Sequence, residues 1–166
     1  MFTHLYIAND HGGLGLKNAL LKYLAEKEYI VDNLGSDNAD IVRYPYYAAR
    51  VARNVLDTPG AGGILICSTG IGMSIIANKF KGIRAALCTS GFMAKATRMH
   101  NDSNILCLGG RITGEFEAFD IVDNWLSSEF EGGRHNISLN IVKDAEEEMI
   151  FKNDCNLCHI AREDEK

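Results

Sequence analysis

Residues 62–80 read "GGILICSTGIGMSIIANKF": an apolar run, a glycine turn and then apolar residues at helical spacing. The run 62–67 is short and continuously apolar, which is typical of a strand buried on both faces of a sheet. The segment 72–80 predicts a helix that returns over that sheet. This strand–turn–helix unit decides the fold, because a parallel sheet is built by repeating it.

The same alternation extends along the chain in both directions. Five strands, each followed by a helix, predict an α/β protein: a Rossmann-like, three-layer α/β/α sandwich around a five-stranded parallel sheet. We assign residues 1–151 to a single domain and residues 152–166 to a polar C-terminal tail. The expected strands are 5–9, 29–35, 62–67, 83–88 and 104–110, and the expected helices are 14–27, 44–56, 72–80, 90–101, 115–130 and 137–151.

Composition excludes several classes of function. The chain has 166 residues, of which 46% are hydrophobic and 23% charged, as in an ordinary globular protein with one core. Its formal net charge of −5 argues against nucleic-acid and anionic-membrane partners, since both favour clustered cations. No apolar run approaches the roughly 20 residues of a membrane span, and no secretion signal is visible. We therefore expect a cytoplasmic protein whose five cysteines are reduced.

Cys67 occupies the last position of the predicted strand 62–67. Ligands of parallel sheets bind beyond the carboxyl ends of the strands, so the thiol lies where chemistry is expected. The amides of the turn at Gly70 to Gly72 would lower the thiol pKa below its free value of about 8.5 and could hold an oxyanion. The alternative is that Cys67 is a buried apolar side chain that fills the core. Spacing alone does not decide between a reactive thiol and such a core residue. For Cys88 and Cys107 the core residue is the favoured interpretation.

Two nucleotide-binding patterns fail at this turn. A Walker A loop needs a lysine before its hydroxyl residue, and the chain has Gly72-Met73-Ser74. A dinucleotide-binding fingerprint needs a third glycine, and that position is Ile75. A dinucleotide-dependent oxidoreductase is therefore disfavoured.

Four motifs resemble one known family. "NDHGG" (9–13), "GILICSTGIGMSIIANKFKGIRAALC" (63–88), "HNDSNILCLGGRITG" (100–114) and "FEGGRHN" (130–136) are similar to the ribose-5-phosphate isomerase B family, which includes galactose-6-phosphate isomerase subunits. The resemblance covers about residues 4 to 136. It implies aldose–ketose isomerisation of a sugar phosphate through a cis-enediolate in the pentose phosphate pathway, without a metal or organic cofactor. It also implies a homodimer or homotetramer whose active sites draw on two subunits.

The resemblance assigns roles residue by residue. Cys67 takes the place of the catalytic base, since the position used by a glutamate in another branch of the family is Met73 here. Thr69 matches a hydroxyl that moves protons on the substrate oxygens. His100 matches the ring-opening histidine, with Asp10 as its helper, and all of these residues are expected at the ligand-binding edge of the sheet. The expected substrate-binding residues are His11, Ser68, Gly70, Gly72, Ser74, Asn101, Arg111 and Arg134.

The chain departs from the family pattern near the expected phosphate site. Ser138 stands where a second phosphate-binding arginine is common, and Arg43 stands where aspartate is common. Arg43 could supply the missing charge from another direction. Because of these changes, the sequence does not determine which sugar phosphate is the substrate. They are also compatible with an alternative function, that of a non-catalytic sugar-phosphate-binding protein or the supporting subunit of a hetero-oligomeric isomerase.

The C-terminal segments carry two further patterns. "CNLCH" (155–159), with Cys155, Cys158 and His159, matches a haem-attachment motif, but that chemistry normally requires export, and a zinc site would need further ligands. A reduced polar extension is the favoured interpretation. "DAEEEM" (144–149) is typical of a solvated acidic helix face.

Overall fold

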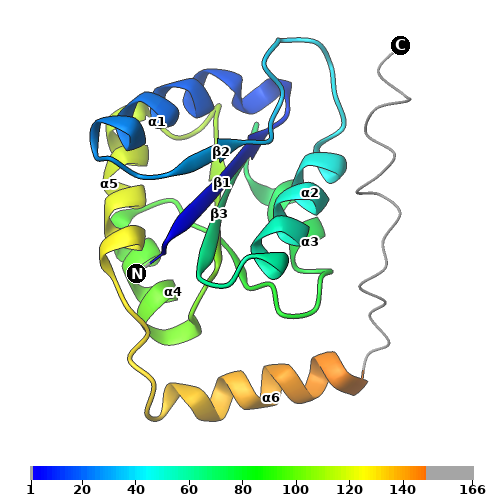
Figure 1. The fold of residues 1–166 in the computed structure, drawn as a ribbon, viewed down its shortest axis with the longest axis vertical. Coiled ribbons are helices and arrows are strands. Elements are labelled where there is room, and N and C mark those ends of the chain that lie inside the picture. Colours follow the sequence, from blue (N-terminus) through cyan, green and yellow to red (C-terminus); the bar gives the residue numbers. More distant parts are fainter. Residues whose placement is uncertain (1, 149–166) are drawn as a thin grey trace.

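The computed structural model describes residues 2–148 and confirms the α/β sandwich (Figure 1). One parallel sheet holds five strands in the order β2-β1-β3-β5-β4. The strands are β1 (His4–Asn9), β2 (Val31–Asn33), β3 (Ala61–Cys67), β4 (Ala85–Leu87) and β5 (Ile105–Gly109). The helices are α1 (Leu14–Glu26), α2 (Tyr44–Asp57), α3 (Ile71–Ala77), α4 (Gly91–Asn101), α5 (Glu115–Ser127) and α6 (His135–Glu148), with a short 3-10 helix, η1 (His11–Gly13), before α1.

Several elements are shorter than the sequence predicts. The strands β2 and β4 have three residues each because they are the outermost strands and pair on one side only. The helix α3 ends at Ala77, since the side chain of Asn78 bonds both the N–H and the carbonyl of Ala85, each at 2.8 Å. Residues 149–151, predicted as the end of the last helix, lie outside the described residues.

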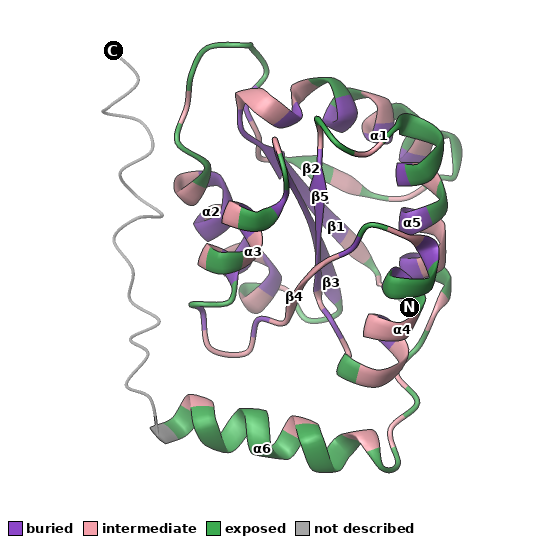
Figure 2. Cartoon of the chain, turned by 180° about the vertical axis from the view of Figure 1, so that it is seen from behind, coloured by how far each residue is buried: buried purple, intermediate pink, exposed green. Residues whose placement is uncertain are grey.

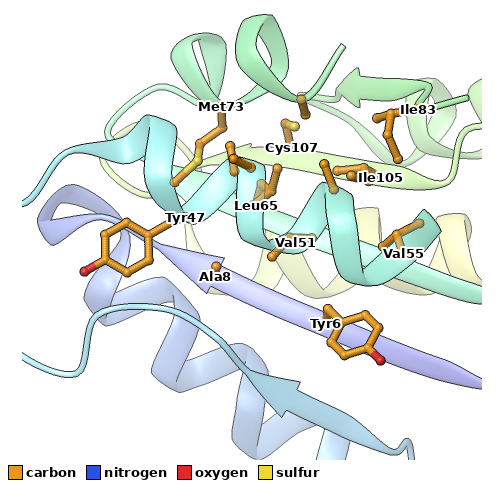
Figure 3. Close-up of a cluster of buried hydrophobic side chains, with 14 of the residues drawn as sticks. Tyr6, Ala8, Tyr47, Val51, Val55, Leu65, Met73, Ile83, Ile105 and Cys107 are labelled. Atoms are coloured by element: carbon orange, nitrogen blue, oxygen red, sulfur yellow. The ribbon is translucent and has the colours of Figure 1, made fainter. Parts of the chain in front are cut away.

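The two faces of the sheet have separate cores. Side chains of α2 and α3 pack on one face, and side chains of α1, α4 and α5 pack on the other. Figure 3 shows the α2/α3 core, in which Val51 and Val55 meet Leu65 of β3 and Ile105 of β5. All seven residues of β3 are buried, so the apolar run that predicted the fold forms the centre of the molecule.

The direction of the chain gives the sheet two functionally different edges. Cys67, at the end of β3, pairs with Gly109 at the end of β5, so both mark the carboxyl edge. The helix α4 leaves that edge and ends at the opposite one. There the Nε atom of Arg84, just before β4, donates to the carbonyl of Asn101 at 3.0 Å.

The helix α6 crosses below the amino edge, apart from both helical layers (Figures 1 and 2). Its side chains Ile137 and Ile141 are 66% and 64% exposed. Asp144, Ala145 and Glu147 are exposed, as expected for a solvated acidic face, whereas the carboxylate oxygens of Glu146 accept from the N–H of Gly82 at 3.1 and 3.2 Å. Met149, the last residue of that stretch, lies outside the described residues. Across residues 2–148, α6 included, no helix combines the length and the apolar character needed to cross a membrane.

Candidate active site

Cys67 closes β3 with its thiol held by the following turn. The backbone N–H of Gly70 donates to Sγ at 3.1 Å, and Cys67 as a residue is 5% exposed. Gly70 has φ +76°, a left-handed conformation that favours glycine and leads the chain from this turn into α3. An N–H donated to sulfur stabilises negative charge there. The residue is thus both part of the α2/α3 core and in contact with the glycine turn.

The other two described cysteines differ from Cys67. Cys88 is 1% exposed and Cys107 is fully buried. Burial raises the pKa of the Cys88 thiol to about 11, and it raises the pKa of Cys107 well above its ordinary value. Both thiols are therefore protonated at neutral pH, and the prediction that they fill the core is confirmed.

The turn that follows Cys67 presents one hydroxyl to solvent. Thr69 is exposed, and its Oγ1 accepts from the N–H of Ile71 at 3.4 Å. The hydroxyl of Ser74 instead donates to the carbonyl of Ile71 at 2.9 Å, within α3. Met73 is fully buried and so fills the core rather than facing the site.

A second loop packs tightly against this turn. Asp10 is 6% exposed, and its Oδ1 accepts from the N–H of Gly12 at 2.8 Å. A Cβ on Gly12 would collide with Oγ of Ser68 and would lie 3.2 Å from Oδ1 of Asp10. The hydroxyl of Ser68 and the carboxylate of Asp10 therefore both lie close to this glycine. The loops after β1 and β3 form one continuous surface at the carboxyl edge.

The same edge carries an imidazole and two guanidinium groups. Nδ1 of His11 accepts from the N–H of Val42 at 3.4 Å, an arrangement that leaves the ring proton on Nε2 as a donor. Arg111 is exposed and is anchored by its N–H, which donates to the carbonyl of Ser68 at 3.1 Å. Arg43, also exposed, directly precedes α2 and follows Val42. The carboxyl edge thus combines donors for an anion with the thiol and hydroxyls.

Three of the expected site residues do not join this group within one chain. His100 and Asn101 end α4 at the amino edge, and Arg134 immediately precedes α6 there. The length of β5 alone, five residues, separates the two edges by about 13 Å. The expectation that all motifs meet at one edge is therefore wrong for a single chain, and Asp10 does not contact His100. A helix after a parallel strand returns to the amino edge, so His100 and Asn101 lie at the end of α4, and Arg134 lies in the segment between α5 and α6.

Sequence reasoning missed three residues near these groups. His135 stacks on His100 with ring centroids 4.4 Å apart, and "GGRH" was the available signal. Tyr44 covers Gly72, where a Cβ would lie 2.8 Å from the ring. Lys17 is fully buried and holds the segment after β2 by donating to the carbonyl of Ser36 at 2.8 Å. A lysine on the apolar side of a predicted helix was its only sequence signal.

A parallel α/β/α sandwich with a thiol, hydroxyls and guanidinium groups at its carboxyl edge is typical of enzymes that act on small molecules. The profile of the family described as Ribose/Galactose Isomerase matches residues 5–142, and the chain belongs to this family.

Known relatives agree with that membership. Ribose-5-phosphate isomerase B of Escherichia coli (strain K12) is 45% identical over 126 residues, which cover 76% of this chain and 85% of the relative. The solved structure of ribose-5-phosphate isomerase B from Clostridium thermocellum is 43% identical with a TM-score of 0.85, covering 87% of this chain and 98% of that one. The enzyme from Mycoplasma genitalium, solved with bound ribulose-5-phosphate, is 39% identical with a TM-score of 0.84, covering 87% and 97%.

Proposed function

We propose that this protein interconverts an aldose phosphate and a ketose phosphate, ribose 5-phosphate and ribulose 5-phosphate or a related pair, with Cys67 as the base. Family membership supports the reaction class. The single observation that carries the proposal is the contact of 3.1 Å between the N–H of Gly70 and Sγ of Cys67. It holds a thiol, with support for its anionic form, at the edge where sheets of this kind bind ligands.

The chemistry requires one carbon-bound proton to move between adjacent carbons. The Cys67 thiolate removes the proton from C2 of the open-chain aldose, leaving a cis-enediolate, and returns it to C1. A second proton passes from the oxygen on C2 to the oxygen on C1, and the exposed hydroxyl of Thr69 is suited to relay it. Atoms and electrons balance without an oxidant, a metal or a cofactor.

The substrate phosphate needs hydrogen-bond donors at the far end of the sugar. This chain supplies the Nε2–H of a neutral His11 imidazole and the guanidinium of Arg111, which forms charge-assisted bonds to phosphate oxygens. Ser68, Gly70, Gly72 and Ser74 would line the remainder of the loop beneath the sugar. Arg43 lies at the same edge and is a further source of positive charge. The reaction belongs to the pentose phosphate pathway in the cytoplasm if the sugar is ribose 5-phosphate.

The site requires a second copy of the chain. His100, Asn101 and Arg134 occupy the amino edge, about 13 Å or more from Cys67. A homodimer in which the amino edge of one protomer faces the carboxyl edge of its partner would complete two equal sites by symmetry. The exposed apolar side chains of α6, Ile137 and Ile141, are suited to bury against that partner. A homotetramer would be a pair of such dimers.

Mixing two inactive variants tests the shared site. Cys67→Ala and His100→Ala chains each lack one half of every site, so each homodimer should be inactive. Random re-association after mild unfolding of an equimolar mixture should restore about a quarter of the wild-type activity, because half of the dimers then hold one intact site of two. No recovery, with heterodimers verified by mass spectrometry, would place both residues in the same chain's site.

Solvent hydrogen exchange tests the reaction itself. Wild-type protein incubated in deuterated water with ribose 5-phosphate should incorporate deuterium at C1 or C2, while Cys67→Ala should lower that rate by about 10²–10⁴-fold. Cys88→Ala is the matched control, since Cys88 is a buried thiol on the other face of the sheet. The supporting-subunit alternative, which Ser138 favours, predicts no exchange with any pentose, tetrose or hexose phosphate by either protein.

A further inference from the structure

Two imidazoles and one carboxylate converge at the amino edge. His100 comes from the end of α4, Glu131 from the segment before α6, and His135 from the first residue of α6. Each offers one ligand atom, and these three atoms all lie within 4.8 Å of one another. Only His100 has a part in the proposed reaction, so the other two groups need a separate explanation.

The cluster is held by contacts on each of its members. The rings of His100 and His135 stack with an angle of 14° between their planes. Nε2 of His135 lies 3.4 Å from Oε2 of Glu131. The N–H of Glu131 donates to the carbonyl of Met99 at 3.0 Å, which ties this segment to the last turn of α4. The three ligands are therefore brought together by the fold rather than by one flexible loop.

We propose that His100, Glu131 and His135 bind a transition-metal dication of the zinc class. Two imidazole nitrogens and one carboxylate oxygen form a ligand set used for Zn²⁺ with a fourth position left to water. The nitrogen donors disfavour Mg²⁺ and Ca²⁺, which prefer oxygen. Neutral imidazoles with one carboxylate carry a charge of −1, which partly compensates the dication.

Binding an ion requires the ligand atoms to approach one another. Ligand atoms around a tetrahedral ion with bonds near 2.1 Å lie about 3.4 Å apart, so atoms up to 4.8 Å apart must close by up to about 1.4 Å. Glu131 is exposed and can rotate its carboxylate inward, while the two partly buried rings must open their stack so that their in-plane nitrogen lone pairs converge on the ion. The exposed guanidinium of Arg134 is free to turn towards solvent while its neighbour His135 binds.

Metal binding has a consequence that rests on the proposed function. A nitrogen of His100 that binds the ion can neither donate nor accept a proton. Occupancy therefore withdraws the ring-opening group and inhibits the isomerase, and a phosphorylated sugar and the ion compete for the same edge.

Isothermal titration with Zn²⁺, and visible absorption with Co²⁺ as a spectroscopic substitute, test the site. The full-length chain is used with Cys155→Ser, Cys158→Ser and His159→Asn, because those residues are themselves strong zinc ligands. We expect one ion per chain. His135→Ala and Glu131→Gln in the same background should each weaken binding at least tenfold and remove the visible Co²⁺ bands. Asn136→Ala, next to His135 and exposed, is the control that should bind as the parent does.

Activity gives a second, separate measurement. With substrate held well below KM, zinc should inhibit the parent at least tenfold at saturation, with a midpoint equal to the measured dissociation constant, and Glu131→Gln should relieve that inhibition. Equal zinc binding by the parent, His135→Ala and Glu131→Gln would overturn the proposed site. A parent inactive without zinc would count against the isomerase proposal alone, since the titration does not depend on activity.

Discussion

Nζ of Lys17 lies 2.6 Å from Oδ1 of Asp37, and it donates as well to the carbonyl of Ser36 at 2.8 Å. The lysine is fully buried although its partner carboxylate is 77% exposed. Lys17 therefore stabilises the start of the segment that runs from β2 to α2. Further along, the same segment meets His11 through the N–H of Val42. A buried charge on α1 is in this way connected to the position of an expected phosphate ligand.

Replacing Asp37 by asparagine should destabilise the protein in a pH-dependent way. The hydrogen bond from Lys17 lowers the pKa of the Asp37 carboxyl below its ordinary value. The stabilisation is therefore present above the unfolded pKa of about 3.9 and is lost as pH falls through the lower, folded pKa. At pH 7, Asp37→Asn should lower the free energy of unfolding by about 1 kcal/mol, a modest value because the carboxylate is exposed.

Urea denaturation at pH 7 and at pH 3 measures this effect. The difference in the free energy of unfolding between wild type and Asp37→Asn should be smaller at pH 3 than at pH 7. Asp40→Asn, an exposed residue on the same segment, should change stability by no more than about 0.5 kcal/mol at either pH. A penalty for Asp37→Asn that is independent of pH would contradict an ionic origin.

Gly70→Ala should disrupt the turn that holds the Cys67 thiol. Gly70 has φ +76°, and a Cβ there would lie 2.6 Å from Leu87 Cδ1 and 2.9 Å from the carbonyl carbon of Leu108. Because backbone cannot move aside cheaply, we expect a loss of about 2 kcal/mol in stability and a fall in kcat of at least tenfold. Gly114→Ala is the control, since a Cβ there meets nothing within 4 Å. Thermal unfolding and initial rates on both variants check the prediction.

Much of this fold follows from local patterns in the chain. The continuous apolar run 62–67 predicts a central strand, and β3 is buried at every residue. The lengths of β2 and β4 could not be predicted in the same way, because they depend on which strands are outermost. Strand order depends on long-range packing between segments such as β4 and β5. The spacing of apolar residues within either segment does not predict that the two strands pair.

The features of the site also fall into two groups, those that local sequence predicts and those that depend on long-range packing. The position of Cys67 at a strand end follows from the apolar run that precedes it, and its glycine turn follows from the next residues. The stacking of His135 on His100 joins segments 35 positions apart, which no local pattern encodes. The edge occupied by His100 could have been deduced, since a helix that follows a parallel strand ends at the amino edge. A match to the motifs of a family does not show at which edge of the sheet each motif lies.

Thiol labelling should separate the core cysteines from solvent-accessible ones. Burial raises the pKa of Cys88 to about 11, so at pH 7.5 its thiol is protonated and unreactive. Iodoacetamide on the folded protein should leave Cys88 and Cys107 unmodified, and both should react within minutes in concentrated urea. Peptide-resolved mass spectrometry gives the extent at each position. Equal labelling of Cys88 with and without urea would contradict its burial beneath α4 and α5.

Restoring an arginine at position 138 should tighten substrate binding. Ser138 is exposed on α6, one helical turn after Arg134, so a side chain there extends from the same face. One added charge-assisted contact to phosphate contributes about 1.5–3 kcal/mol, which corresponds to at least a tenfold lower KM. The value of kcat should change little, because this interaction is made equally with substrate and transition state.

The control for Ser138→Arg is Asn140→Arg, which adds the same charge to the same helix two residues further on. Because positions 138 and 140 project from different sides of the helix, Asn140→Arg should leave KM within about twofold. Steady-state kinetics with ribose 5-phosphate at two ionic strengths distinguishes a specific contact from general attraction, since only the latter weakens strongly with salt. If both variants lower KM alike, position 138 does not face the phosphate and the proposed orientation of α6 over the partner's carboxyl edge is wrong.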